Sequence, residues 1–409
     1  MGYLPIIEVN NVTKIFGPNP ETAIQLLAQG WSKERILKET KHTVGVNQVS
    51  FSIEAGEIFV IMGLSGSGKS TLVRLLNRLI EPTSGSIRIH GQDIVRMDGE
   101  QLRQLRRKQI GMVFQKFALF PHRTVAQNVE FGLEIQGIGR QERRARAMEA
   151  LALVGLEGYA DSLPAELSGG MQQRVGLARA LATDPDILLM DEAFSALDPL
   201  IRRDMQDELV QLQNRMRKTI VFITHDLDEA LRLGDRILLM KDGSVVQIGT
   251  PEDILMNPAN DYVERFIENV DRSKVLTASH VMIRPETITL DKGPRVAMRL
   301  MRQSNISNLF VVDRERKLLG IITAEGASAA VREGKPLEDI LIRDIPTVSP
   351  DRVVNELFEL CSSSKVPVAV VDDDHKLLGI LIRGSLLGGL SGSLQTSGGR
   401  DEHAQAPVG

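Results

Sequence analysis

The stretch EIFVIMGLSGSGKS, residues 57–70, decides the fold of this chain. An apolar run ends at Met62, three glycines follow within six residues, and Lys69 opens a segment with a helical pattern. A buried strand, a glycine-rich turn and a helix in this order are the context of a phosphate-binding loop. The backbone N–H groups of such a loop surround phosphate oxygens. The stretch therefore predicts an α/β protein that binds a nucleotide.

Composition limits the class of protein. A length of 409 residues suggests roughly two to four domains. The 49 basic and 53 acidic residues nearly balance, so no nucleic-acid partner is expected. The single cysteine, Cys361, excludes a disulfide within one chain and fits a reducing compartment. No segment reads as a signal peptide or a membrane span, so we expect a cytoplasmic chain that reaches a membrane only through a partner.

Strand-like apolar runs alternate with helical patterns over the first two thirds of the chain. The runs include VSFSI, IGMVF, ILLMD and TIVFIT, and this alternation predicts an α/β core with parallel strands. Residues 117–164 are mostly helical and predict a helical subdomain on that core. The core and its subdomain are expected to form one domain over residues 1–276.

Residues 18–44 read as an ordered insert between the first two strands. Asn19 as N-cap, Pro20 at the first helical position and Gly30 as terminator predict one helix. A second short helix is expected after Ser32, and the insert contains the only tryptophan, Trp31.

A repeat occupies the C-terminal part. NLFVVDRERKLLGIIT at 308–323 matches PVAVVDDDHKLLGILI at 367–382 with a constant offset of 59 residues. Neither copy could bury its apolar face alone, so we expect units 277–335 and 336–390 to pair into one domain. Residues 391–409 are polar and glycine-rich and predict a disordered tail.

The phosphate loop supplies the first candidate site residues. Its N–H groups would hold the β-phosphate, Lys69 would reach the β- and γ-phosphate oxygens, and Ser70 would hold Mg²⁺. The nucleotide-binding residues expected in this segment are Gly63, Ser65, Gly66, Gly68, Lys69, Ser70 and Thr71.

Two carboxylates end the buried strand ILLMDE at 187–192. Such a position is unfavourable for charge unless a partner occupies it. Asp191 suits the Mg²⁺ shell, and Glu192 suits a general base that polarises the attacking water.

Three further side chains stand at strand ends. His225 follows TIVFIT, where it can reach a γ-phosphate or the attacking water, although a lone histidine is more often packed or solvated. Gln115 follows IGMVF and could touch both Mg²⁺ and a moving subdomain. Phe16 closes the first strand and could stack on adenine, although an aromatic residue there is more often part of a core.

LSGGMQQR, residues 167–174, is a second phosphate-facing helix start. Ser168 caps it, and Gly169 and Gly170 would let a large anion approach the main chain. One chain thus carries two such helix ends, about a hundred residues apart.

These motifs together resemble the ATP-binding subunits of ABC transporters over residues 6 to about 265. The resemblance rests on GLSGSGKS, Gln115, LSGGMQQR, ILLMDE, SALD at 195–198 and His225, in that order. It implies a head-to-tail homodimer in which Ser168, Gly169 and Gly170 of one subunit cap the ATP on the phosphate loop of the other. Asp198 would connect the two sites.

The insert after Phe16, MDEAFSALDPLIR and the tandem repeat make the chain similar to the ATPase subunit of glycine betaine/proline uptake systems. In that family the repeat is a pair of CBS units, here residues 277–390. The resemblance implies ATP and Mg²⁺ as cofactors, an integral-membrane permease as partner, and an indirect periplasmic or extracellular solute-binding protein. It places the chain at the cytoplasmic face of the membrane. Nucleotide-binding CBS motifs commonly carry an Asp that GIITAEG and GILIRGS lack, so adenosine binding by this pair has no support.

Three alternatives remain. The chain could serve an importer of another solute, such as an amino acid, or act as a soluble ABC ATPase without transport. The repeat could also be a purely structural dimerisation element. A charge count favours regulation: residues 284–335 carry ten basic and six acidic residues, and residues 338–383 carry five and nine. Salt weakens contacts made by such opposite faces, which suggests that the pair responds to ionic strength.

Overall fold

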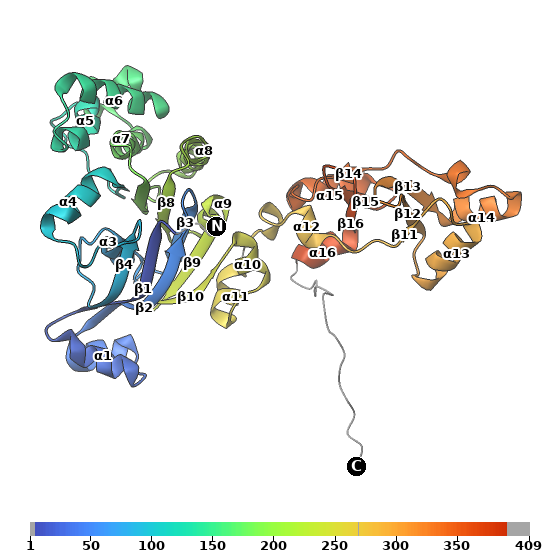
Figure 1. The fold of residues 1–409 in the computed structure, drawn as a ribbon, viewed down its shortest axis with the longest axis horizontal. Coiled ribbons are helices and arrows are strands. Elements are labelled where there is room, and N and C mark those ends of the chain that lie inside the picture. The colour runs from blue at the N-terminus through green and yellow to red at the C-terminus, as the bar shows by residue number, and fades with distance from the viewer. Residues whose placement is uncertain (1–4, 269, 391–409) are drawn as a thin grey trace, which may run out of the picture. The chain divides into compact units, whose positions relative to one another are not determined.

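The computed structural model describes residues 5–268 and 270–390 (Figure 1). The chain divides into two compact units between Val270 and Asp271. The predicted tail, 391–409, lies outside the described residues.

A six-stranded sheet forms the centre of the first unit, and its strands are ordered β10-β9-β3-β8-β7-β6. Their bounds are β3 (Ile58–Gly63), β6 (Ile110–Val113), β7 (Ile187–Asp191), β8 (Thr219–Thr224), β9 (Arg236–Lys241) and β10 (Ser244–Gly249). All neighbours pair in parallel except β9 and β10. The carboxyl ends of β3, β7 and β8 therefore share one edge of the sheet.

A second, antiparallel sheet has the order β2-β1-β4-β5. Its strands are β1 (Ile7–Phe16), β2 (Thr43–Ile53), β4 (Ser84–Ile89) and β5 (Gln92–Asp93). The α/β fold class and the parallel core are confirmed, but these four strands lie outside that core. Helix α3 (Lys69–Leu76) contributes Leu72 and Leu76 to a hydrophobic core shared by both sheets.

Helices α5 (Val125–Ile135), α6 (Arg140–Leu153) and α7 (Gly169–Leu181) pack on one another in the helical subdomain (Figure 1). Thr124 and Gln127 form a capping box at the start of α5. The unit also contains α4 (Gly99–Lys108), α8 (Pro199–Met216), α9 (Leu227–Leu233), α10 (Pro251–Met256) and α11 (Asp261–Ile267), with short 3-10 turns at Glu157–Tyr159 and Pro164–Glu166.

The insert contains α1 (Pro20–Ala28) and α2 (Lys33–Thr40), at the opposite end of the unit from α5 and α6 (Figure 1). Ser32 caps α2 by accepting a hydrogen bond from the Arg35 N–H. The predicted capping by Asn19 is wrong, because its side chain makes no capping bond. Its backbone is left-handed, with φ of 53°, instead of the extended conformation that a capping side chain requires.

The second unit holds two three-stranded sheets. Their strands are β11 (Thr287–Ile288), β12 (Asn308–Val312), β13 (Leu318–Thr323), β14 (Thr347–Val348), β15 (Val368–Val371) and β16 (Leu377–Leu381). The helices are α12 (Ala278–Val281), α13 (Pro294–Gln303), α14 (Ala324–Glu333), α15 (Leu357–Ser363) and α16 (Arg383–Leu390), with 3-10 turns at Arg272–Lys274, Leu337–Ile340 and Val354–Glu356.

The two repeats exchange their leading segments. Ile283, from the first repeat, bridges Ile380 of β16, and Ile342, from the second, bridges Ile321 of β13. The two bridges are related by the 59-residue offset of the repeat. Each repeat therefore completes the sheet edge of the other. Across the described residues of both units, no helix is at once long and apolar enough to cross a membrane.

Candidate nucleotide site

The carboxyl edge of the parallel sheet opens into a cavity of about 660 Å³. Strand β3 runs into the phosphate loop there, and β8 is followed by His225. The cavity is lined by Phe16, Lys33, Glu34, Leu37, Thr43, Val44, Gly45, Leu64, Ser65, Gly66, Gly68, Lys69, Ser70, Thr71, Glu192 and His225. Most of the predicted nucleotide-binding residues thus meet in one place.

Close packing explains why two positions of the phosphate loop are occupied by glycine. Both adopt positive φ, 149° at Gly63 and 104° at Gly68. A Cβ atom on Gly63 would lie 2.3 Å from the Met240 carbonyl oxygen, and one on Gly68 would lie 2.3 Å from the Gly45 carbonyl oxygen. No side chain fits at either position, because strands β2 and β9 lie against the loop on two sides.

Lys69 is buried at the mouth of the loop, with 5% of its surface exposed. Its Nζ donates to the carbonyl oxygens of Gly63, at 2.8 Å, and Leu64, at 3.2 Å. Desolvation lowers the pKa of Lys69, and the charges of Glu192 and Asp191 oppose that shift. A phosphate oxygen is a stronger acceptor than a carbonyl, so an incoming anion can replace these bonds.

Ser70 and Asp191 supply oxygen atoms beside the loop. The Ser70 hydroxyl donates to Asp191 Oδ1 at 3.2 Å. Burial raises the pKa of Asp191, and the bond from Ser70 opposes the shift. Hard oxygen ligands of this kind suit Mg²⁺, which keeps several waters and takes substrate phosphate oxygens as further ligands. No cluster of three or more His, Cys, Asp or Glu residues suited to a metal occurs among residues 5–268 and 270–390.

Three predicted residues meet at one carboxylate. Oε1 of Glu192 lies 3.3 Å from His225 Nδ1, and its Oε2 accepts a hydrogen bond of 3.1 Å from the Gln115 amide nitrogen. Its backbone, with φ of 46°, is held by a bond from its N–H to the Ile223 carbonyl. Gln115 also donates to the Ser195 hydroxyl at 3.0 Å. The two neighbours fix the direction of a carboxylate that remains about one-fifth exposed.

Phe16 lies at the end of β1 and lines the cavity with 40% of its surface exposed. The Lys14 ammonium lies 5.1 Å from the centre of its ring. This exposure places Phe16 outside the hydrophobic core. Its ring is therefore available for stacking on a base.

The second helix end lies apart from this cavity. Ser168 caps α7 by accepting a bond from the Met171 N–H at 3.3 Å, and both Ser168 and Gly169 are exposed. Gly170 approaches Ile201, whose Cγ2 would lie 2.6 Å from an added Cβ. Asp198 is also exposed and caps α8 through the Ile201 N–H at 3.1 Å. The cavity lining includes none of these four predicted residues.

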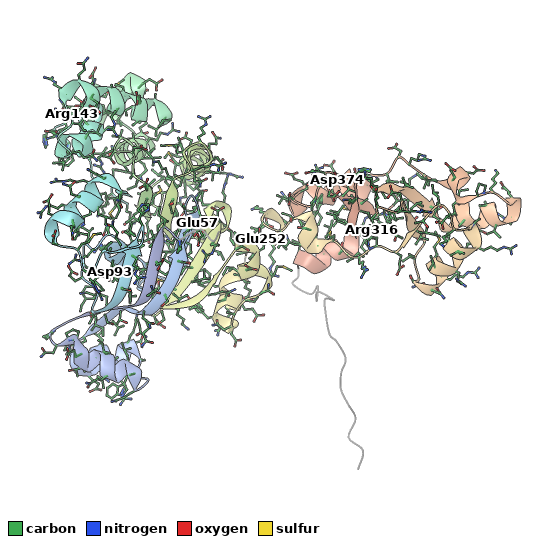
Figure 2. The ribbon with its side chains drawn as sticks, in the orientation of Figure 1. Glu57, Asp93, Arg143, Glu252, Arg316 and Asp374 are labelled. Atoms are coloured by element: carbon green, nitrogen blue, oxygen red, sulfur yellow. The ribbon has the colours of Figure 1, made fainter. Side chains whose placement is uncertain are left out.

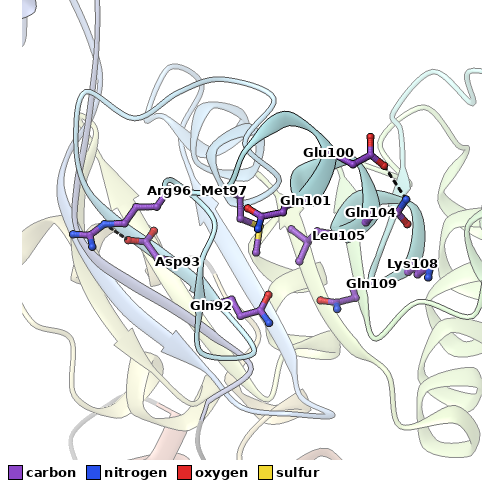
Figure 3. A pocket seen from close by; sticks show the side chains of 10 residues that line it. All are labelled: Gln92, Asp93, Arg96, Met97, Glu100, Gln101, Gln104, Leu105, Lys108 and Gln109. Carbon is purple, nitrogen blue, oxygen red and sulfur yellow. Dashed lines mark hydrogen bonds and ion pairs between the residues drawn. The ribbon is translucent and has the colours of Figure 1, made fainter.

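Another cavity of similar size lies between β5 and α4 (Figure 3). Its lining runs from Gln92 to Gln109 and contains none of the motif residues. We therefore assign no nucleotide to it.

The model of the ABC transporter family matches residues 46–195, and the CBS domain model matches residues 278–332 and 337–392. The chain is 59% identical over 403 residues to the glycine betaine transport ATP-binding protein OpuAA of Bacillus subtilis, covering 98% of this chain and 96% of the relative. It is 61% identical over 389 residues to the glycine betaine/carnitine transport ATP-binding protein GbuA of Listeria monocytogenes, covering 95% and 98%.

The chain belongs to the family of glycine betaine transport ATP-binding proteins. The chain is also similar to the dimeric ATP-binding cassette MJ0796, solved in a post-hydrolysis state with ADP and Pi. That match has 35% identity and a TM-score of 0.51, and covers 60% of this chain and 98% of the other. The predicted family, the ABC-type ATPase activity and the CBS pair are confirmed.

The sequence did not reveal several residues of the cavity. Lys33, Glu34 and Leu37 come from α2 of the insert. Outside the cavity lining, Ser195 accepts a hydrogen bond from Gln115, which the sequence did not reveal either. Ser195 lies inside the SALD motif, so its position was a usable signal. The three insert residues belong to no motif, and only the folding of the insert against β2 brings them to the cavity.

Proposed function

We propose that this ATPase powers import of glycine betaine or a related quaternary ammonium solute through a separate membrane permease. The observation that carries the proposal is the similarity to glycine betaine transport ATP-binding proteins along 98% of the chain. The similarity therefore includes both the insert and the CBS pair.

In the proposed reaction, the phosphate-loop N–H groups and Lys69 hold the β- and γ-phosphates. Ser70 and Asp191, with Gln115 as the third predicted ligand, would hold Mg²⁺, and the ion would neutralise charge on the phosphate oxygens. Glu192 accepts a proton from the attacking water, and His225 and Gln115 keep its carboxylate directed at that water. The contacts of Glu192 with both residues support these roles.

Two chains form a head-to-tail dimer in this proposal. Ser168, Gly169 and Gly170 of one subunit close over the ATP on the phosphate loop of the other, and Asp198 lies between the two sites. The exposure of the α7 N-terminus, away from the cavity of its own chain, supports this arrangement. The dimeric cassettes among the solved relatives support it as well.

The partners follow from the transport role. The chain binds a permease at the cytoplasmic face of the membrane and cooperates indirectly with a periplasmic or extracellular solute-binding protein. Similarity to ATP-binding subunits of transport systems supports the permease contact.

Purification of the native complex from membranes, followed by mass spectrometry, tests the proposal. We expect a permease to co-purify, and the complex in vesicles to accumulate labelled glycine betaine when ATP is supplied on the side of the ATPase. The Glu192→Gln complex is the matched control and should accumulate none. Uptake of an amino acid in place of glycine betaine, or purification with ribosomes or nucleic acid, would contradict the proposal.

We further propose that the CBS pair regulates transport in response to ionic strength. The repeats carry net charges of about +4 and −4 over residues 284–335 and 338–383, from ten minus six and five minus nine. Arg316 and Asp374, one from each repeat, occupy the corresponding turns β12–β13 and β15–β16 (Figure 2). At about 0.1 M salt the Debye length is ~10 Å, so such surface attractions weaken as salt concentrates.

Truncation after Val275 tests this regulation in vesicles that carry the full transporter with ATP inside. We expect the truncated transporter to be active at low internal salt, where the full-length transporter is inactive. If it still requires high internal salt, the pair is not the sensor.

A further inference from the structure

The insert contacts the phosphate loop directly through one side chain. Lys33, the first residue of α2, donates from Nζ to the Gly66 carbonyl oxygen at 2.9 Å. The same ammonium lies 3.7 Å from Asp242 Oδ1, in the turn between β9 and β10. Gly66 has a φ of 78°, so Lys33 anchors a peptide of the loop in a conformation that other residues rarely adopt. Lys33 thus connects three segments that are distant in sequence.

Lys33 can donate a further hydrogen bond to an anion. An ammonium group carries three hydrogens, and the two contacts described use at most two of them. The contact with Asp242 is long, and that carboxylate is 60% exposed, so it contributes little on its own. A phosphate oxygen in the adjoining cavity would be a stronger partner than either.

One helical turn further along, Leu37 lines the same cavity. Residues four apart lie on one face of a helix, so Lys33 and Leu37 face the cavity together. Leu37 is 46% exposed and Phe16 is 40% exposed, although both are large and apolar. Two exposed apolar side chains in a cavity that ends at a phosphate loop fit a ligand with a flat apolar part and a charged part. A nucleoside triphosphate has this composition.

The insert is firmly attached to the strands that carry this cavity. Ile36 and Ala23 are fully buried in a cluster with Ile15 of β1 and Val44 of β2. Ser32 caps α2 at the end that carries Lys33. The helix face that holds Lys33 and Leu37 is thereby oriented by the same two strands that orient Phe16.

Glu34 is the acidic residue that α2 adds to the cavity lining. Its carboxylate lies in the first turn of the helix, where a backbone N–H and Ser32 lower its pKa. It is therefore engaged by its own helix end, which is the favourable position for a negative charge.

We propose that α2 forms part of the ATP site. Lys33 anchors the phosphate loop at Gly66 and donates to a phosphate oxygen of ATP, and Leu37 packs on the adenine base together with Phe16. This inference rests on the proposed ATP site and assigns the insert a role in binding the nucleotide.

Equilibrium binding of ATP and of inorganic tripolyphosphate to the purified full-length chain separates the two contributions. Lys33→Ala should raise the Kd of both ligands about fivefold or more, because it removes a charged donor, and Lys33→Arg should restore part of the affinity. Leu37→Ala should raise the Kd of ATP about threefold and leave that of tripolyphosphate unchanged, because tripolyphosphate has no base.

Matched controls exist on the same protein. Lys38 is an exposed lysine of α2 outside the cavity, and Leu153 is 43% exposed in α6. Alanine at either position should leave both affinities unchanged. The inference is overturned if Lys33→Ala and Leu37→Ala bind ATP like wild type, or if Leu37→Ala weakens both ligands equally. Lys69→Ala distinguishes the failures: if it fails to weaken ATP binding, the proposed ATP site itself is wrong.

Discussion

Two glycine-rich helix starts in the first unit, those of α3 and α7, have opposite surroundings. The start of α3 is enclosed by β2, β9 and α2, and Lys69 within it is 5% exposed. The start of α7 is capped by Ser168 and opens to solvent. The same local chemistry, bare N–H groups and small residues, therefore gives a nearly complete site in one case and an open half in the other. The open surroundings of α7 are those that the proposed head-to-tail dimer requires, in which this helix end acts on ATP bound to the other subunit.

The largest effect is expected where the two helix ends act together. Glu192→Gln keeps the shape of the side chain but cannot accept a proton from water. ATP hydrolysis should fall by a factor of about 100 or more, and ATP should hold two chains together as a dimer. Turnover assays and gel filtration with and without ATP measure both, with the wild-type chain as control. Hydrolysis near the wild-type rate would mean that Glu192 is not the general base.

ATP binding by the single chain distinguishes the enclosed end, which is the N-terminus of α3, from the open end, which is the N-terminus of α7. Lys69→Ala removes a buried cation from the enclosed end and should raise the Kd of ATP about tenfold or more. Ser168→Arg blocks the open end and should leave the Kd of the monomer unchanged. Titration below the dimerisation concentration measures this. Equal loss in both variants would show that the open end binds ATP within its own chain.

Mixing the two variants sharpens the comparison. A dimer of Lys69→Ala with Ser168→Arg contains one intact composite site and one doubly damaged site. If both variants associate randomly, about a quarter of the wild-type activity should return. Each variant alone is the control. Recovery without any detectable dimer would contradict the head-to-tail arrangement.

The smallest effect concerns stability. Burial raises the pKa of Asp191, so folding favours its protonated form. The contribution of Asp191 to the free energy of unfolding is therefore most favourable below the ordinary pKa of about 4. It is lost as the pH rises through the raised pKa of the folded state. Asp191→Asn should raise the Tm of the nucleotide-free chain at neutral pH by about 2 °C while ATP hydrolysis is lost.

Measurement of the Tm of this variant and of the wild type as a function of pH tests the explanation. The gain over wild type should shrink toward acid pH, where Asp191 is protonated in both states. A Tm below wild type at neutral pH would show that the charge stabilises the enclosed end.

Much of the site could be predicted from local sequence. Strand-to-loop transitions at Gly63, Asp191 and His225 mark the carboxyl edge of a parallel sheet, and parallel neighbours bring their ends together. The capping prediction at Asn19 failed because the same residue types also adopt the left-handed conformation, and the sequence does not distinguish the two uses. The antiparallel sheet of β1, β2, β4 and β5 was not separated from the core, because strand partners are set by long-range register.

Sequence by itself determined the elements and chemistry whose causes are local: the phosphate loop, the cap at Ser168, the repeat offset of 59 residues, and the order of motifs that defines the family. Tertiary structure alone decided which of these elements meet. Lys33 reaches Gly66 across 33 residues, and Ile283 bridges Ile380 across the repeat. Such contacts depend on how buried faces such as that of Ile36 pack, and packing is a property of the whole core that no short stretch encodes.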